Sequence, residues 1–287
     1  MRYIALAFAL LAAGCTTTPS PGSVLPPATP LAGAACDPPT VIPASIIARV
    51  RAQFEDGRTE PPPAITPEDA AAYQALQTRQ RANDWGNLCY FRTDNAALAA
   101  QPAPADRVVF MGDSITQSWL LSNPDFFGPA RVNRGISGQT TPQMLLRFKS
   151  DVLGLKPSAV HILGGVNDIA GNTGPTTLED VKNNVMSMVE LAQARGVKVI
   201  LATPLPAAEF SWAPKLKPRE AVIQYAAWVR AYAADQNLIV ADYFTPLATR
   251  DGAFRPELTF DGVHPNKKGY AIMEPIAQAA IARALGR

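Results

Sequence analysis

A serine stands shortly after an apolar run in the stretch VVFMGDSITQSW, residues 108–119. Gly112 and Asp113 end the run, and Ser114 stands where a more polar segment begins. A serine at a strand-to-helix junction is commonly a cap or a turn residue. Its hydroxyl is also a weak nucleophile until a base takes its proton. A catalytic role for Ser114 therefore needs partner residues elsewhere in the chain.

The sequence contains two histidines, and their surroundings differ. His161 lies inside the apolar run SAVHILGG, which predicts a buried, hydrogen-bonded strand position. His264 lies in DGVHPN, three residues after Asp261. In Asp-x-x-His the carboxylate can accept the Nδ1 proton of the imidazole, which leaves Nε2 available as a base. His264 is therefore the candidate base for Ser114.

Two further segments offer hydrogen-bond donors. The segment NRGISGQTT, residues 133–141, turns through two glycines, and the N–H of Gly138 can approach a ligand without hindrance from a side chain. The segment GGVND, residues 164–168, places the amide of Asn167 just after another apolar run. Together with the backbone N–H of Ser114, these groups would offer three donors to a tetrahedral oxyanion.

Apolar strand-like runs alternate with helical patterns through most of the chain. The predicted strands are 107–111, 131–133, 159–163, 197–202 and 238–242. The predicted helices are 141–152, 177–195, 218–235 and 267–285. Near-continuous apolar strands separated by helices favour a parallel sheet covered on both faces. The sequence thus predicts an α/β fold, a flavodoxin-like three-layer α/β/α sandwich with a central five-stranded parallel sheet.

This fold class bears on the candidate residues because open parallel sheets place ligands at the carboxyl ends of their strands. Ser114, Gly138 and Asn167 each follow one of the first three strands, and His264 lies in the loop before the last helix. We therefore expect all four residues to meet at one edge of the sheet.

Four segments, GDSIT, NRGISGQTT, GVND and DGVHP, occur in the order of the four blocks of the SGNH hydrolases, also called GDSL-type esterases. The sequence resembles this family over about 107–287, with GDSI in place of GDSL in the first block. The resemblance implies a serine esterase that needs no cofactor and forms an acyl-enzyme. It implies that Ser114 is the nucleophile, His264 the base and Asp261 the orienting acid. It also implies an oxyanion hole formed by Ser114, Gly138 and Asn167.

Other hydrolytic and cofactor-binding arrangements fit the residues less well. Thr116 stands where the G-x-S-x-G elbow of α/β-hydrolases has its second glycine, and the first strand is not followed by G-x-G-x-x-G. A metal site from Asp113, Asp168, Asp261 and His264 would leave Ser114 and Gly138 unexplained. The sequence therefore predicts no metal, and Asp113 and Asp168 are expected to brace loops through backbone hydrogen bonds.

The forms NRGISGQTT and GDSITQSW resemble the acetylhydrolase and carbohydrate acetylesterase branch of the family. That likeness implies short acyl esters, above all acetyl groups on polysaccharide, as substrates. Trp119, Phe210 and Trp212 could wall the substrate cleft, or the last two could pack as core. Other functions left open are a lysophospholipase or thioesterase with longer acyl preference, an O-acyltransferase, and a glycan-binding lipoprotein without catalysis.

The N-terminus has the pattern of an export signal. Arg2 precedes a short apolar run that ends in LLAAGC, which resembles a lipobox with Cys15 as the lipidated residue. An ordinary signal peptide cleaved slightly later is the alternative. Thr16 after the cysteine favours the outer membrane by family analogy. The predicted parts are a leader at 1–15, a Pro/Thr/Ser-rich tether at 16–40, a helical arm at 41–100 and the hydrolase domain at 101–287.

Cysteine content and net charge indicate the compartment of the protein and the kinds of partner it could bind. Once Cys15 carries lipid, Cys36 and Cys89 remain, and an oxidising compartment favours a disulfide between them over two buried thiols. The formal net charge is +2, without a basic stripe, so nucleic acid is not an expected partner. The sequence gives no indication of the oligomeric state.

Overall fold

The computed structural model describes residues 36, 42–54 and 62–287. The predicted leader with the lipidation residue Cys15, and the predicted tether apart from Cys36, lie outside these residues. The chain divides into two units, Met1–Cys36 and Asp37–Arg287, and all described helices and strands belong to the second. None of these helices is both long and apolar enough to cross a membrane.

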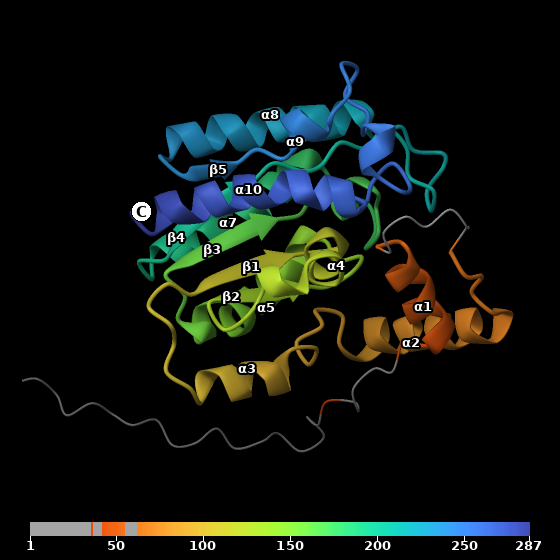
Figure 1. Ribbon diagram of the computed structural model, residues 1–287, viewed down its shortest axis with the longest axis horizontal. Helices are drawn as coiled ribbons and strands as arrows, with labels where there is room; N and C mark the ends of the chain where they lie inside the picture. The colour runs from red at the N-terminus through yellow and green to blue at the C-terminus, as the bar shows by residue number, and fades with distance from the viewer. Residues whose placement is uncertain (1–35, 37–41, 55–61) are drawn as a thin grey trace, which may run out of the picture. The chain divides into compact units, whose positions relative to one another are not determined.

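Five parallel strands form one sheet in the order β2-β1-β3-β4-β5 (Figure 1). The strands are β1 Val108–Gly112, β2 Arg131–Gly135, β3 Ala159–Leu163, β4 Lys198–Ala202 and β5 Ile239–Ala241. They coincide with the five predicted apolar runs, with ends that differ by at most two residues. The first three strands pair in register, so that Gly112 of β1 lies between Gly135 of β2 and Leu163 of β3.

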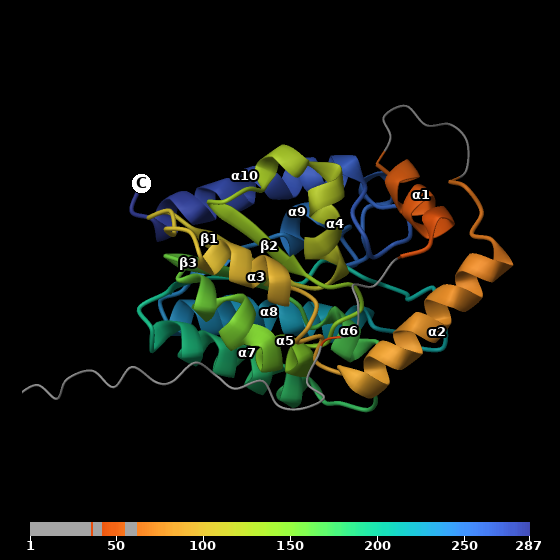
Figure 2. The same ribbon diagram turned by 90° about the horizontal axis from the view of Figure 1, so that it is seen from below.

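Helices cover both faces of this sheet, as the predicted sandwich requires. They are α1 Ala44–Ala52, α2 Pro67–Asn83, α3 Arg92–Ala99, α4 Ser114–Ser122, α5 Thr141–Asp151, α6 Val166–Ile169, α7 Leu178–Gln193, α8 Arg219–Asp235, α9 Phe244–Leu247 and α10 Lys267–Ala284. Val108 and Phe110 of β1 point to the core shared with α4 and α10. Val109 and Met111 point to the core shared with α5, α7 and α8. Figure 2 shows the two helical layers on either side of the strands.

Three helices, α1, α2 and α3, precede the sheet and lie within the segment 41–100 for which the sequence predicts a helical arm. Thr66 is the N-cap of α2, and its hydroxyl accepts a hydrogen bond from the Asp69 N–H at 3.1 Å. Cys36 and Cys89 are disulfide-bonded, which agrees with the sequence-based prediction.

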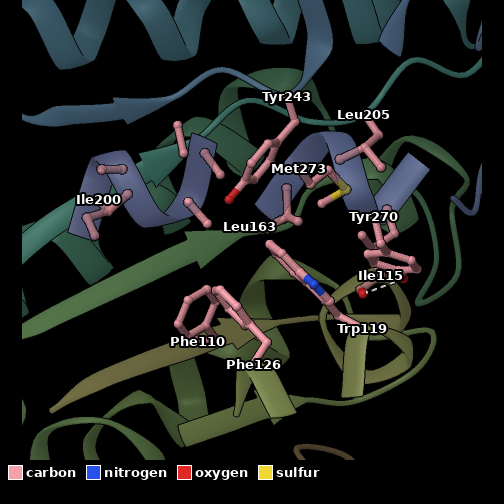
Figure 3. Close-up of a cluster of buried hydrophobic side chains, with 14 of the residues drawn as sticks. Phe110, Ile115, Trp119, Phe126, Leu163, Ile200, Leu205, Tyr243, Tyr270 and Met273 are labelled. Carbon is pink, nitrogen blue, oxygen red and sulfur yellow. Dashed lines mark hydrogen bonds between the residues drawn. The ribbon is translucent and has the colours of Figure 1, made fainter. Parts of the chain in front are cut away.

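Trp119 does not line a cleft, so that prediction is wrong. The side chain is fully buried, its ring stacks on Phe126 at 5.0 Å, and it meets Phe110 edge-on at 6.0 Å (Figure 3). With 3.6 residues per turn, a residue five positions after Ser114 lies about 140° around the helix from it. The face of α4 opposite Ser114 is therefore the face that packs on the sheet.

Arg147 of α5 is a fully buried charged residue at the carboxyl ends of β1 and β2. Its guanidinium donates to the carbonyls of Gly112 at 3.0 Å and Arg134 at 2.8 Å, and it pairs with Asp151 at 3.0 Å. A buried cation is tolerated only when its donors are satisfied. Arg147 thereby holds together the two strand ends from which the glycine segments depart.

Trp119 is buried and Trp212 is exposed, so their alanine variants should differ in stability. Trp119→Ala leaves a large hole in the core and should lower the free energy of unfolding by about 3–5 kcal/mol. Trp212→Ala removes a side chain that is 43% exposed and should cost less than about 1 kcal/mol. Urea denaturation followed by circular dichroism measures both. Equal losses in the two variants would contradict the packing described.

Candidate active site

Ser114 is the first residue of α4, and Asp113 is its N-cap. The Asp113 carboxylate accepts a hydrogen bond from the Ile115 N–H at 3.0 Å, so the serine hydroxyl is not needed as a cap. A Cβ on Gly112 would collide with the Thr116 hydroxyl and would lie 2.8 Å from the Leu163 carbonyl, so this close turn requires glycine. The cap and the turn together leave the Ser114 hydroxyl available to another partner.

That partner is His264, 150 residues away in the sequence. Ser114 Oγ lies 2.9 Å from His264 Nε2. On the other side of the ring, His264 Nδ1 lies 2.7 Å from Asp261 Oδ2. A carboxylate accepts the Nδ1 proton, so Nε2 has its lone pair toward the serine. The structure therefore brings the three predicted residues into one hydrogen-bonded chain.

The loop between Asp261 and His264 holds its own geometry. Asp261 Oδ1 accepts hydrogen bonds from the backbone N–H groups of Val263 at 3.0 Å and His264 at 2.7 Å. The Thr259 hydroxyl donates to the His264 carbonyl at 2.6 Å. One carboxylate thus orients both the backbone and the imidazole, which explains why the acid and the base need a spacing of only three residues.

The charges around His264 favour its protonated form. Burial alone would lower the pKa of His264, but the hydrogen bond and negative charge of Asp261, together with the charge of Asp113, raise it above the ordinary value. Burial raises the pKa of Asp113 to about 6. For Asp261, burial is outweighed by the hydrogen bond and charge of His264, so its pKa is lowered. A stabilised imidazolium is what a base needs after it has taken a proton.

Asn167 connects two segments of the site. They are GDSIT, residues 112–116, which we call the serine block, and NRGISGQTT, residues 133–141, which we call the glycine block. The Asn167 amide nitrogen donates to the Gln139 carbonyl at 3.0 Å and to the Asp113 carboxylate at 3.3 Å. Gly138 has φ +77°, a conformation that favours glycine. The N–H groups of Ser114 and Gly138 donate to no other described residue. The three predicted oxyanion donors therefore come from neighbouring segments, and the first of them opens a helix, where anions are stabilised.

Asp168 and His161 have structural positions, as predicted. The Asp168 carboxylate accepts from the backbone N–H of Thr141 at 2.9 Å and from its hydroxyl at 2.6 Å, and so ties α6, which follows β3, to the start of α5. His161 Nε2 lies 2.8 Å from the Tyr243 hydroxyl, and burial lowers the pKa of His161 to about 3. Among the described residues, no three His, Cys, Asp or Glu side chains are grouped so that they could hold a metal ion.

The two aromatic residues of the 204–218 loop differ in position. Phe210 is fully buried in a cluster with Val222 and Val263, so the cleft-wall alternative is wrong for this residue and the core alternative is confirmed. Trp212 lies on top of it, with ring centroids 5.0 Å apart, and its ring centroid is 6.1 Å from that of His264. The exposed ring of Trp212 therefore borders the site and the buried ring supports it.

Sequence analysis missed Asn172. Its amide nitrogen donates to the Gly138 carbonyl at 3.2 Å and to Asn167 Oδ1 at 2.9 Å, and its own oxygen accepts from Trp212 Nε1 at 3.2 Å. It thus links both candidate oxyanion residues to the exposed tryptophan. The only signal in the sequence is a polar residue five positions after Asn167. It carries no information about partners in three different segments.

The sequence also gave no indication of the role of Gln117, whose side chain contacts the glycine block at Ser137. Its side-chain oxygen accepts hydrogen bonds from the N–H and the hydroxyl of Ser137, the former at 2.9 Å. The backbone just before Gly138 is therefore fastened to α4, the helix that Ser114 begins.

Comparisons with known proteins agree with this architecture. A model of the GDSL-like Lipase/Acylhydrolase family matches residues 110–272. The crystal structure of a GDSL-like lipase from Bacteroides thetaiotaomicron has a TM-score of 0.67 and 41% identity, covering 70% of this chain and all of that chain. An acetylxylan esterase from Xylanibacter ruminicola is 26% identical over 64% of this chain and 45% of its own length. The uncharacterized lipoprotein YqeF of Bacillus subtilis is 37% identical over 27% of this chain. The matched part spans a third of YqeF and less than half of that acetylxylan esterase.

The pKa of His264 can be measured without interference from His161, because burial lowers the pKa of His161 to about 3. Nuclear magnetic resonance titration of the imidazole signals should give His264 a pKa above the ordinary 6.5. Asp261→Asn removes the charge that outweighs burial, so the pKa of His264 should fall. Ser114→Ala removes no charge and serves as the control. A pKa that does not change in Asp261→Asn would contradict the assigned role of this carboxylate.

Proposed function

The chain belongs to the GDSL-like lipase/acylhydrolase family, and on that basis we propose that it hydrolyses carboxylic esters through an acyl-enzyme on Ser114. The observation that carries the proposal is the hydrogen-bonded chain from Ser114 Oγ through His264 to Asp261, with distances of 2.9 and 2.7 Å. A serine, an imidazole and a carboxylate in this order activate a hydroxyl for attack on an acyl carbon.

The reaction has two halves that use the same groups. His264 Nε2 takes the Ser114 proton while Oγ bonds to the ester carbonyl carbon, and the oxyanion accepts hydrogen bonds from the donors of Ser114, Gly138 and Asn167. His264 then gives the proton to the leaving alcohol, and the acyl-enzyme remains. A water molecule loses a proton to His264 and attacks the acyl carbon. The carboxylic acid leaves, and the proton returns to Ser114 Oγ.

Asn167 must change one hydrogen bond during this reaction. In the structure its amide nitrogen has two acceptors, Gln139 at 3.0 Å and Asp113 at 3.3 Å. The longer bond is the weaker one, and we propose that the oxyanion replaces it. Asn172 keeps the amide in orientation throughout, because it holds the Asn167 oxygen from the opposite side.

The proposed substrates are acylated carbohydrates, with acetyl as the first acyl group to test. The acetylxylan esterase among the relatives supports this class by its name. Trp212 supports it by position, since an exposed aromatic ring beside the base can pack against the apolar face of a sugar. The alcohol would then lie between Trp212 and His264, where the leaving oxygen receives its proton.

We also propose that the protein is exported and anchored by lipid at Cys15. The support is the LLAAGC ending of the apolar leader, the match to a lipoprotein over a short segment, and the disulfide between Cys36 and Cys89. The tether at 16–40 would separate the anchor from the hydrolase domain at 101–287.

Hydrolysis of p-nitrophenyl acetate tests the proposed nucleophile. Ser114→Ala should abolish turnover, because no other hydroxyl contacts His264 Nε2 among the described residues. Ser187→Ala, on the far side of the sheet in α7, is the matched control and should keep the full rate. Wild-type turnover that survives in Ser114→Ala would overturn the proposal.

The oxyanion assignment has a separate test. Asn167→Ala removes one donor and should lower kcat by roughly 10²–10³, with KM changed far less. Asn183→Ala, at an exposed position of α7, is the control. A near-normal kcat in Asn167→Ala would remove Asn167 from the oxyanion hole. Asn172→Ala should lower kcat by a smaller factor, since it acts by orienting Asn167.

A further inference from the structure

A cavity of about 420 Å³ opens beside the glycine block, between the arm and the hydrolase domain. We call it the arm cavity. Its lining comes from α1, α2 and the segment after α2, from α4, and from residues 136–139 and 172–173. The volume is within the range of pockets that bind small organic ligands. The arm residues lie before the segment that matches the family, so the shared hydrolase fold does not account for this wall.

Aliphatic side chains from two helices face each other across the arm cavity. They are Ile46, Ile47 and Val50 of α1, and Leu120 and Leu121 of α4. The side chains of Ile47, Leu120 and Leu121 are 37%, 43% and 42% exposed. Apolar surface left open on both sides of one cavity is typical of a binding site for an apolar group.

Hydrogen bonds fasten this wall to the residues around Gly138. The Gln139 amide donates to Asn87 Oδ1 at 2.9 Å, and the Gln143 amide donates to the Trp85 carbonyl at 2.6 Å. Gln117, which holds Ser137, also donates to the Tyr90 hydroxyl at 2.7 Å. The segment that closes the cavity is thus tied to the segment that carries a candidate oxyanion donor.

The position of the cavity indicates which part of an ester would enter it. The lining includes Gly138 and Asn172 but not Ser114, Asn167, His264 or Trp212, so the cavity adjoins the site on the Gly138 side. The leaving alcohol must lie beside His264 Nε2, which gives it a proton, and the oxyanion must lie beside the Gly138 N–H. The acyl substituent takes the remaining direction from the tetrahedral carbon. We propose that the arm cavity binds the acyl chain, so that the enzyme accepts linear acyl groups well beyond acetyl.

This inference rests on the proposed ester hydrolysis and adds the acyl class to it. In wild-type protein, kcat/KM for p-nitrophenyl esters should rise from acetate to octanoate, by about fourfold for each methylene that the cavity buries. Ile47→Asp and Leu121→Asp place a carboxylate on either wall. Each should lower the octanoate-to-acetate ratio of kcat/KM by about tenfold or more, because a charge beside an alkyl chain is costly.

Two controls match these variants in residue type and exposure. Ile65 is 38% exposed and Leu191 is 42% exposed, and neither lines the cavity. Ile65→Asp and Leu191→Asp should keep the wild-type ratio. Turnover of the acetate ester reports folding in every variant, so a loss confined to octanoate identifies the cavity rather than general instability.

The possible results distinguish a failure of the proposed acyl cavity from a failure of the proposed ester hydrolysis. Acetate turnover that depends on Ser114, with the same octanoate-to-acetate ratio in all variants, would overturn the acyl cavity and leave the esterase standing. No turnover of any ester would overturn both. A parallel series of methyl to octyl acetates covers the alcohol side: if the two wall variants alter that series instead, the cavity holds the alcohol and the acyl assignment is wrong.

Discussion

The parallel sheet imposes the constraint on which the site depends: the carboxyl ends of its strands share one edge. β1, β2 and β3 deliver Ser114, Gly138 and Asn167 to that edge, and the loop before α10 delivers His264. Buried Arg147 maintains this edge by holding the carbonyls at the ends of β1 and β2. Residues far apart in the sequence therefore lie within hydrogen-bond distance of one another.

Within that frame, neighbouring residues have separate tasks. Asp113 caps α4, which leaves the hydroxyl of Ser114 for His264. Asp261 uses one oxygen for the backbone of its loop and the other for the imidazole. Asn172 and Gln117 hold the glycine block from opposite sides. The arrangement is consistent with a proton shuttle that needs little movement during the proposed reaction.

Sequence analysis predicted the strands, the sheet type and the triad partners because each leaves a local signal: an apolar run, a spacing of three residues, a glycine after a strand. It was wrong about Trp119, because nothing in a short helix indicated which face would pack on the sheet. It left cleft and core open for Phe210, because loop residues have no periodicity that separates buried from exposed positions. Arg147 and Asn172 were missed since their partners come from several segments and are chosen only by the folded chain. The arm cavity was missed for the same reason.

If Ser114 is a nucleophile activated by His264, a fluorophosphonate probe will react with it. The serine oxygen displaces fluoride from phosphorus and leaves a stable adduct that mass spectrometry of peptides can locate. We expect one adduct, on Ser114, that forms in step with the loss of esterase activity and does not form in His264→Ala. An adduct on another residue, or full activity after complete labelling of Ser114, would show that Ser114 is not the nucleophile.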